Sequence, residues 1–126
     1  MEATLYAAMI WVSAVTGWDM PPYRPAALPM SPAINAITGG MSDAVFFPNV
    51  GPHGTIYFQR GVDEAVIVHE VVHFFQRERG ENPRTSKEEC LFELKAEEIE
   101  NLWRAERGLP EARPYYELCG KFMKGG

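Results

Sequence analysis

Residues 69–76 read HEVVHFFQ and hold two of the chain's three histidines, His69 and His73, with Glu70 directly after the first. On a helix, side chains four residues apart lie one above the other, about 5–6 Å apart at Cβ. His69 and His73 can therefore both direct a ring nitrogen at one metal ion, at about 2.0–2.1 Å. Glu70 lies about 100° further round the helix, beside the metal instead of on it. One helical turn thus places two ligands and a carboxylate together.

The rest of this predicted helix is apolar on almost every side, which is typical of a buried helix. Buried polar groups are destabilising unless they have partners, and a bound metal would partner both histidines. A carboxylate at position 70 can then take a proton from a metal-bound water, whose pKa zinc lowers to about 7. The pattern favours a Zn²⁺ site with Glu70 as general base over an apolar core helix that carries two histidines by chance.

A zinc ion that keeps one position open for water needs a third protein ligand. The remaining histidine, His53, falls in a predicted turn and is a poor match. A second long helix is predicted from a capping box at Ser86 to a stop at Gly108. Four glutamates form one stripe on it, next to an apolar stripe that would turn them toward the histidines: Glu89, Glu93, Glu97 and Glu100. Spacing alone lets either Glu93 or Glu97 be the third ligand.

HEVVH, nineteen further residues and then ELKAE at 93–97 resemble the gluzincin metallopeptidases, of which thermolysin is the best known. In that clan two histidines and a downstream glutamate bind zinc, and the glutamate often opens an E-x-x-A/S-D/E motif. The resemblance implies that Glu93 is the third ligand and that Glu97 is the carboxylate that orients His69. The resemblance covers about residues 44–107, and the chain as a whole is similar to minigluzincins, the smallest single-domain forms.

The resemblance also implies a strand at the edge of the cleft, ahead of the metal helix, that binds substrate in extended form. TIYFQ, residues 55–59, stands in that place. Together with AVFF at 44–47 and the turn-rich segment between them, it predicts a β-hairpin. Four side chains are candidate donors to a developing oxyanion, each with an ordinary structural role as the alternative: Tyr115, Tyr116, Arg113 and His53. For Gln76, on the histidine face, a structural hydrogen bond is the favoured role.

The remaining sequence predicts a small α+β domain of zincin type that spans residues 1–126 as a single unit. Its N-terminal helix covers 4–16 and ends at Gly17. The proline-rich stretch 18–32 excludes a long helix and a central strand, so we expect an ordered, wrapping segment. Asp63 caps the metal helix, which runs to about Arg79 and packs on the second long helix that carries the third ligand. Residues 111–126 predict one short helix and a frayed end.

Composition limits the partners and the compartment. The formal net charge is −5 and no block of like charge occurs, which argues against nucleic acid. The apolar stretch 5–15 is too short for a membrane span of about 20 residues, and it lacks the basic flank of a secretory signal. We therefore expect no transmembrane segment and a cytoplasmic location, with a secreted or periplasmic location as the alternative. Cys90 and Cys119 can pair, but two free thiols are the favoured interpretation.

These features predict a zinc-dependent metallopeptidase that acts on a peptide or protein substrate, in an unspecified oligomeric state. The alternative is a non-catalytic or weakly active zincin-fold binding module that retains its zinc. A di-iron carboxylate protein would also use Glu70-x-x-His73, but it needs a second Glu-x-x-His on another helix. The sequence contains no second copy, which argues against that class.

Overall fold

The computed structural model describes residues 1–40 and 42–120. These residues form helices and one mixed sheet in the following order: α1 (Glu2–Thr16), β1 (Ala26–Pro29), α2 (Pro32–Ile37), β2 (Ala44–Phe47), β3 (Thr55–Phe58), α3 (Glu64–Glu78), α4 (Ser86–Glu106) and α5 (Pro114–Leu118). The predicted α+β class is confirmed.

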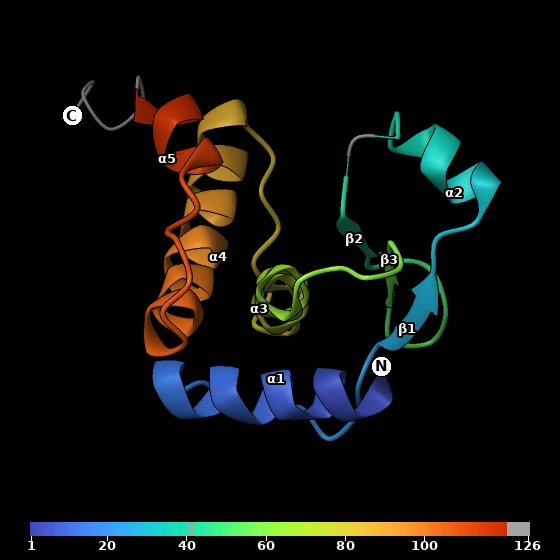
Figure 1. Ribbon diagram of the computed structural model, residues 1–126, viewed down its shortest axis with the longest axis horizontal. Helices are drawn as coiled ribbons and strands as arrows, with labels where there is room; N and C mark the ends of the chain where they lie inside the picture. The colour runs from blue at the N-terminus through green and yellow to red at the C-terminus, as the bar shows by residue number, and fades with distance from the viewer. Residues whose placement is uncertain (41, 121–126) are drawn as a thin grey trace.

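Helix α3 lies at the centre of the fold. Figure 1 looks along its axis and shows α1 below it, α4 and α5 on one side and the sheet on the other. Because other elements surround it, apolar side chains on every face are removed from water; Val68, Val71 and Phe74 are fully buried. The prediction of a buried helix that packs on a second long helix is confirmed.

The ends of the two long helices follow from local sequence. Asp63 caps α3, and its side chain accepts a hydrogen bond from the backbone N–H of Ala65 at 2.9 Å. The cap of α4 is Thr85, whose hydroxyl accepts from the backbone N–H of Glu88 at 3.1 Å. The capping box therefore begins one residue earlier than the predicted start at Ser86.

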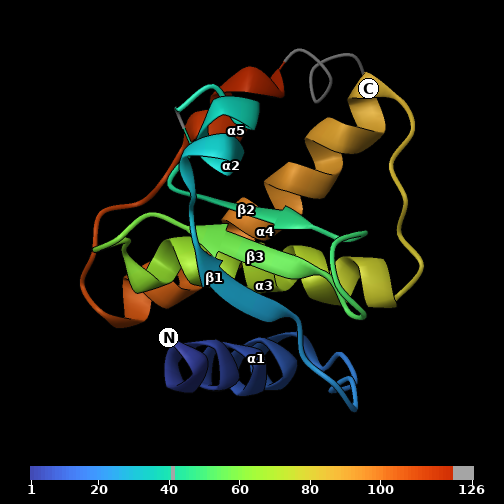
Figure 2. The ribbon, with the colours of Figure 1, turned by 90° about the vertical axis from the view of Figure 1, so that its right-hand side faces the viewer.

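The sheet has the order β1-β3-β2, as Figure 2 shows in front of α3. The predicted hairpin is confirmed, because β2 pairs antiparallel with β3. The prediction that residues 55–59 form the edge strand is wrong. The proline-rich stretch supplies β1, which pairs parallel with β3 and makes β3 the central strand. An edge position suits β1, since Pro29 has no N–H to donate.

The C-terminal part of the described chain folds back along α4. A disulfide joins Cys90 of α4 to Cys119, which follows α5, with 5.6 Å between their Cα atoms. The favoured prediction of two free thiols is therefore wrong. The predicted short helix corresponds to α5, and the predicted frayed end at 121–126 lies outside the described residues. Across the described ranges, every helix is too short or too polar to cross a bilayer.

Candidate metal centre

Three side chains from two helices converge in the protein interior. His69 and His73 come from one turn of α3, and Glu93 comes from α4, which runs antiparallel beside it. The Nε2 atoms of His69 and His73 each lie 2.9 Å from an oxygen of the Glu93 carboxylate. The three ligand atoms lie within 4.8 Å of one another, and both histidines are buried. This is the geometry of a candidate His₂Glu metal site.

A carboxylate on α4 orients His69. Nδ1 of His69 lies 2.9 Å from Oε1 of Glu100. The Glu100 side chain is buried, and its Oε2 accepts a hydrogen bond from Nε of Arg104 at 2.7 Å. Since an ionised carboxylate only accepts, Nδ1 of His69 carries the proton and Nε2 is left to face Glu93. The implied role of Glu97 as this partner is wrong. Glu100 lies seven residues after Glu93, and two helical turns return it to nearly the same face.

A side-chain amide orients His73. Nδ1 of His73 lies 2.8 Å from Oε1 of Gln76, and Nε2 of Gln76 donates to the backbone carbonyl of Phe92 at 3.1 Å. The bond to Phe92 turns the amide oxygen toward His73, so Nδ1 is the protonated nitrogen. The structural hydrogen bond predicted for Gln76 is confirmed by its bond to the Phe92 carbonyl. Its second bond, to His73, was not predicted.

The second nitrogen of His73 tests whether the site fits a metal. Nε2 is buried and has no hydrogen-bond partner among the described residues, although Glu93 Oε1 lies only 2.9 Å away. With the proton on Nδ1, a nitrogen lone pair faces a carboxylate oxygen. Two electron-rich atoms at that distance require a cation between them. The donor set, two imidazole nitrogens and one carboxylate, is one that Zn²⁺ accepts.

Without a metal, a proton can take the corresponding place between His69 and Glu93. Burial lowers the pKa of His69, but its contacts with Glu100 and Glu93 outweigh burial and raise the pKa to about 10. Burial raises the pKa of Glu93, but its contacts with both histidines lower the pKa to about 2. Glu93 is therefore ionised and His69 protonated near neutral pH. A metal ion and a proton compete for the same place.

Glu70 lies beside the triad and is not part of it. Its side chain is buried, and it lines a cleft of about 310 Å³ together with His73 and Glu93. Burial raises the pKa of Glu70 above its usual value, whereas the charges of His73 and His69 and a backbone hydrogen bond from Phe46 lower it. In the described part of the chain no side chain bonds to Glu70, so its carboxylate is available to a molecule in the cleft.

The edge strand β2 forms one wall of this cleft. Val45 and Phe46 line it from β2, Pro48 from the following turn, and Phe92 from α4. Arg77 at the end of α3 and Pro83 and Glu89 close it on the remaining sides. The strand beside the site is thus β2, and not the predicted segment 55–59.

One of the four candidate oxyanion donors lies at the site. The ring of Tyr115 stacks on the ring of His69, with 5.7 Å between centroids. Burial raises the pKa of Tyr115, and the negative charges of Glu93 and Glu70 raise it further, so its hydroxyl keeps its proton. Tyr116 and Arg113 stack on each other along a different cavity. His53 stacks on Tyr23 in the β2–β3 turn.

Comparisons of the chain with protein-family models, with curated proteins and with solved structures found no match. The geometry therefore carries the assignment. The fold and the site define an α+β protein with a buried candidate metal site made by His69, His73 and Glu93.

Proposed function

We propose that this chain is a zinc-dependent metallopeptidase of the gluzincin type. The observation that carries the proposal is the convergence of the Nε2 atoms of His69 and His73 on Glu93, with Glu70 beside them in a cleft and without a side-chain partner among the described residues. Three protein ligands with room for a fourth are typical of catalytic zinc, whereas structural zinc has four. A zinc ion held there would lower the pKa of a water molecule to about 7 and polarise a carbonyl group.

Glu70 is the proposed general base. Its carboxylate faces the cleft from the same helix as the two histidines, so it can accept a proton from water next to the triad. Burial raises its pKa toward the operating range that favours a base able to take up a proton and later release it to the leaving amine.

Tyr115 is the proposed donor to the carbonyl oxygen as negative charge develops on it. Of the four candidates, only this side chain lies against a triad residue. Its raised pKa keeps the hydroxyl protonated and able to donate.

Strand β2 is the proposed docking edge for substrate. Within the described residues it pairs with β3 on one side only, and its other side faces the cleft. An extended peptide can add there as a further strand through backbone hydrogen bonds, which places a scissile bond beside Glu70.

The non-catalytic zinc module is the second candidate function, favoured by the small cleft. An ionisable Glu70 without a side-chain partner supports catalysis instead, because a binding module gains nothing from burying it.

The Cys90–Cys119 disulfide is typical of an oxidising compartment, which supports the secreted or periplasmic alternative over the cytoplasmic one.

A digest of a broad peptide library tests the proposal. The zinc-loaded protein should cleave peptides, and a chelator should stop cleavage. Glu70→Gln should keep zinc and lose cleavage, because the amide has the same shape but cannot take the proton. If the zinc-loaded protein cleaves nothing, the module is the correct function. If Glu70→Gln loses zinc instead, Glu70 is a ligand and the assigned geometry is wrong.

A further inference from the structure

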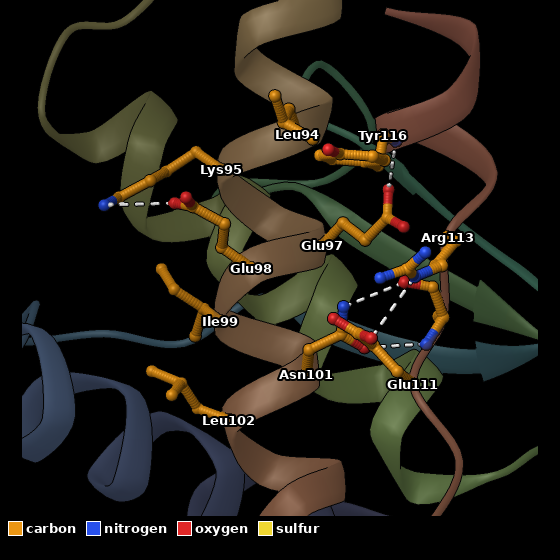
Figure 3. A pocket seen from close by; sticks show the side chains of 11 residues that line it. Leu94, Lys95, Glu97, Glu98, Ile99, Asn101, Leu102, Glu111, Arg113 and Tyr116 are labelled. Atoms are coloured by element: carbon orange, nitrogen blue, oxygen red, sulfur yellow. Dashed lines mark hydrogen bonds and ion pairs between the residues drawn. The ribbon is translucent and has the colours of Figure 1, made fainter. Parts of the chain in front are cut away.

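Residues 111–119, here called the strap, cross the outer face of α4 and carry Tyr115 to the metal centre. Helix α5 within the strap has no buried residue. A cavity of about 600 Å³ is lined by residues of α4, among them Leu94 and Leu102, and by residues of the strap, among them Ala112 and Tyr116. Figure 3 shows side chains that line it. Apolar packing therefore contributes little to the position of the strap, and other contacts must hold it.

Three sets of contacts hold the strap to α4. The side chain of Asn101 bonds to Ala112 in both directions: its amide donates to the carbonyl at 2.8 Å, and its oxygen accepts from the N–H at 2.8 Å. The carboxylate of Glu97 accepts from the backbone N–H groups of Tyr115 at 2.8 Å and Tyr116 at 3.1 Å. The disulfide from Cys90 to Cys119 closes the far end.

The α4 residues that make these contacts lie in one row along the helix. Cys90, Glu97 and Asn101 are seven and four residues apart, so they lie on one face of α4, next to the face that carries Glu93 and Glu100. The strap meets them in reverse order and so runs antiparallel to α4. Helix α4 thus holds both the candidate ligand Glu93 and the segment whose Tyr115 stacks on His69.

We propose that Glu97 is a positioning residue whose carboxylate, with Asn101 and the disulfide, holds the ring of Tyr115 on the ligand His69. Glu97 is 2% exposed, yet one of its oxygens has no hydrogen-bond partner among the described residues. A buried carboxylate is costly, and two backbone donors of the strap are the contacts that compensate it. Glu97 thus acts on the metal centre through Tyr115 and not through His69.

The inference rests on the proposed function for its catalytic meaning, but its test uses the metal-free protein. The chain has three histidines, so the ring protons of His69 can be assigned by NMR and followed at one fixed pH. Tyr115→Leu removes the stacked ring and sets the scale of the change in chemical shift. Glu97→Ala should move the His69 signals toward that value, and Glu97→Gln should restore them, because an amide oxygen can accept both bonds.

Glu98→Ala is the matched control. Glu98 is the next residue on α4, is exposed, and pairs only with Lys95 among the described residues, so its loss should leave the His69 signals unchanged. In a Tyr115→Leu background, Glu97→Ala should cause no further change, since the effect passes through Tyr115. Zinc titration of the same variants should show a loss of affinity of about tenfold for Glu97→Ala, the lower end of the range for an outer contact.

The outcomes separate the two proposals. If Glu97→Ala and Asn101→Ala, both folded by circular dichroism, leave the His69 signals of wild type, the positioning role is wrong. The positioning role is also wrong if Glu97→Ala changes the His69 signals as much in the Tyr115→Leu background as it does in wild type. If Glu97→Ala does not fold, Asn101→Ala alone decides the role. A protein that shows the predicted shifts but cleaves no peptide retains the strap and refutes the peptidase.

Discussion

The two candidate ligand histidines, His69 and His73, are oriented by acceptors of different kinds. His69 is held by the carboxylate of Glu100, which Arg104 holds in turn, whereas His73 is held by the neutral amide of Gln76. A hydrogen-bonded partner of this sort fixes which ring nitrogen is free to bind metal. The contact with Glu100 assigns to that residue the role that the sequence resemblance implied for Glu97.

A series at position 100 tests this assignment. Glu100→Ala should weaken zinc binding by about 10–100-fold, because His69 loses the acceptor that fixes its ring. Glu100→Gln should lose less, since the amide oxygen can still accept from Nδ1. Glu93→Ala should remove most of the zinc, and Glu98→Ala should remove none. Competition with a coloured chelator measures all four affinities. Equal affinities for Glu100→Ala and wild type would contradict the contact.

The metal-free protein should lose stability on both sides of a pH window. Glu93 has a pKa lowered from 4.5 to about 2, so its stabilising effect is complete above about 4.5 and is lost as the pH falls toward 2. His69 has a pKa raised from 6.5 to about 10, so its effect is complete below about 6.5 and is lost as the pH rises toward 10.

Thermal melts between pH 5 and pH 10 check the alkaline side. The Tm of metal-free wild type should fall between pH 6.5 and about 10, because folding then no longer benefits from the protonated His69. The Tm of the zinc-loaded protein should fall less, since the ion replaces the proton. A metal-free His69→Gln variant is the control. The same decline in that variant would show that other groups cause the loss.

At the scale of elements, periodicity predicted what local sequence determines. The buried helix over 64–78 and its acidic partner over 86–106 follow from spacing, caps and apolar stripes. Strand β1 was missed because prolines conceal a strand that lies at an edge. The choice between Glu97 and Glu100 was also out of reach, because both lie within half a turn of Glu93 as seen down the helix. In the structure Glu100 bonds His69, and Glu97 bonds the backbone N–H groups of Tyr115 and Tyr116 instead.

The disulfide also escaped prediction, since nothing in the sequence shows that the chain returns along α4. It closes a loop between residues 29 positions apart. Reduction should destabilise the protein by about 2–4 kcal/mol, the usual range for a native disulfide. Urea unfolding with and without reductant measures the loss. The double variant Cys90→Ser with Cys119→Ser should be equally destabilised and indifferent to reductant; an unchanged midpoint on reduction contradicts this.

On the scale of the whole molecule, the candidate metal centre joins the central helix α3 to α4. Helix α3 is also covered by α1, through Leu5, Met9 and Val12, and by the sheet through Phe46. An ion bound only by the folded arrangement adds its binding free energy to the stability of the entire chain.

The purified protein should hold close to one zinc per chain, and chelation should lower its Tm. At free zinc about 100 times the Kd, the expected stabilisation is about 2.7 kcal/mol. Elemental analysis and melts with and without chelator measure both quantities. His73→Gln is the control, because its melt should not respond to chelator. Absence of zinc together with a wild-type melt that ignores chelator would refute the metal site.

The unequal partners of the two histidines would make them unequal donors to a metal ion in the candidate site. An imidazole that donates to a carboxylate is a stronger electron donor to its metal than one that donates to an amide. His69, hydrogen-bonded to Glu100, would therefore be the stronger donor, and it lies against the ring of Tyr115. His73, hydrogen-bonded to Gln76, would be the weaker donor, and it borders the cleft. A molecule that enters along β2 would thus meet His73, the weaker of the two ligands, before His69.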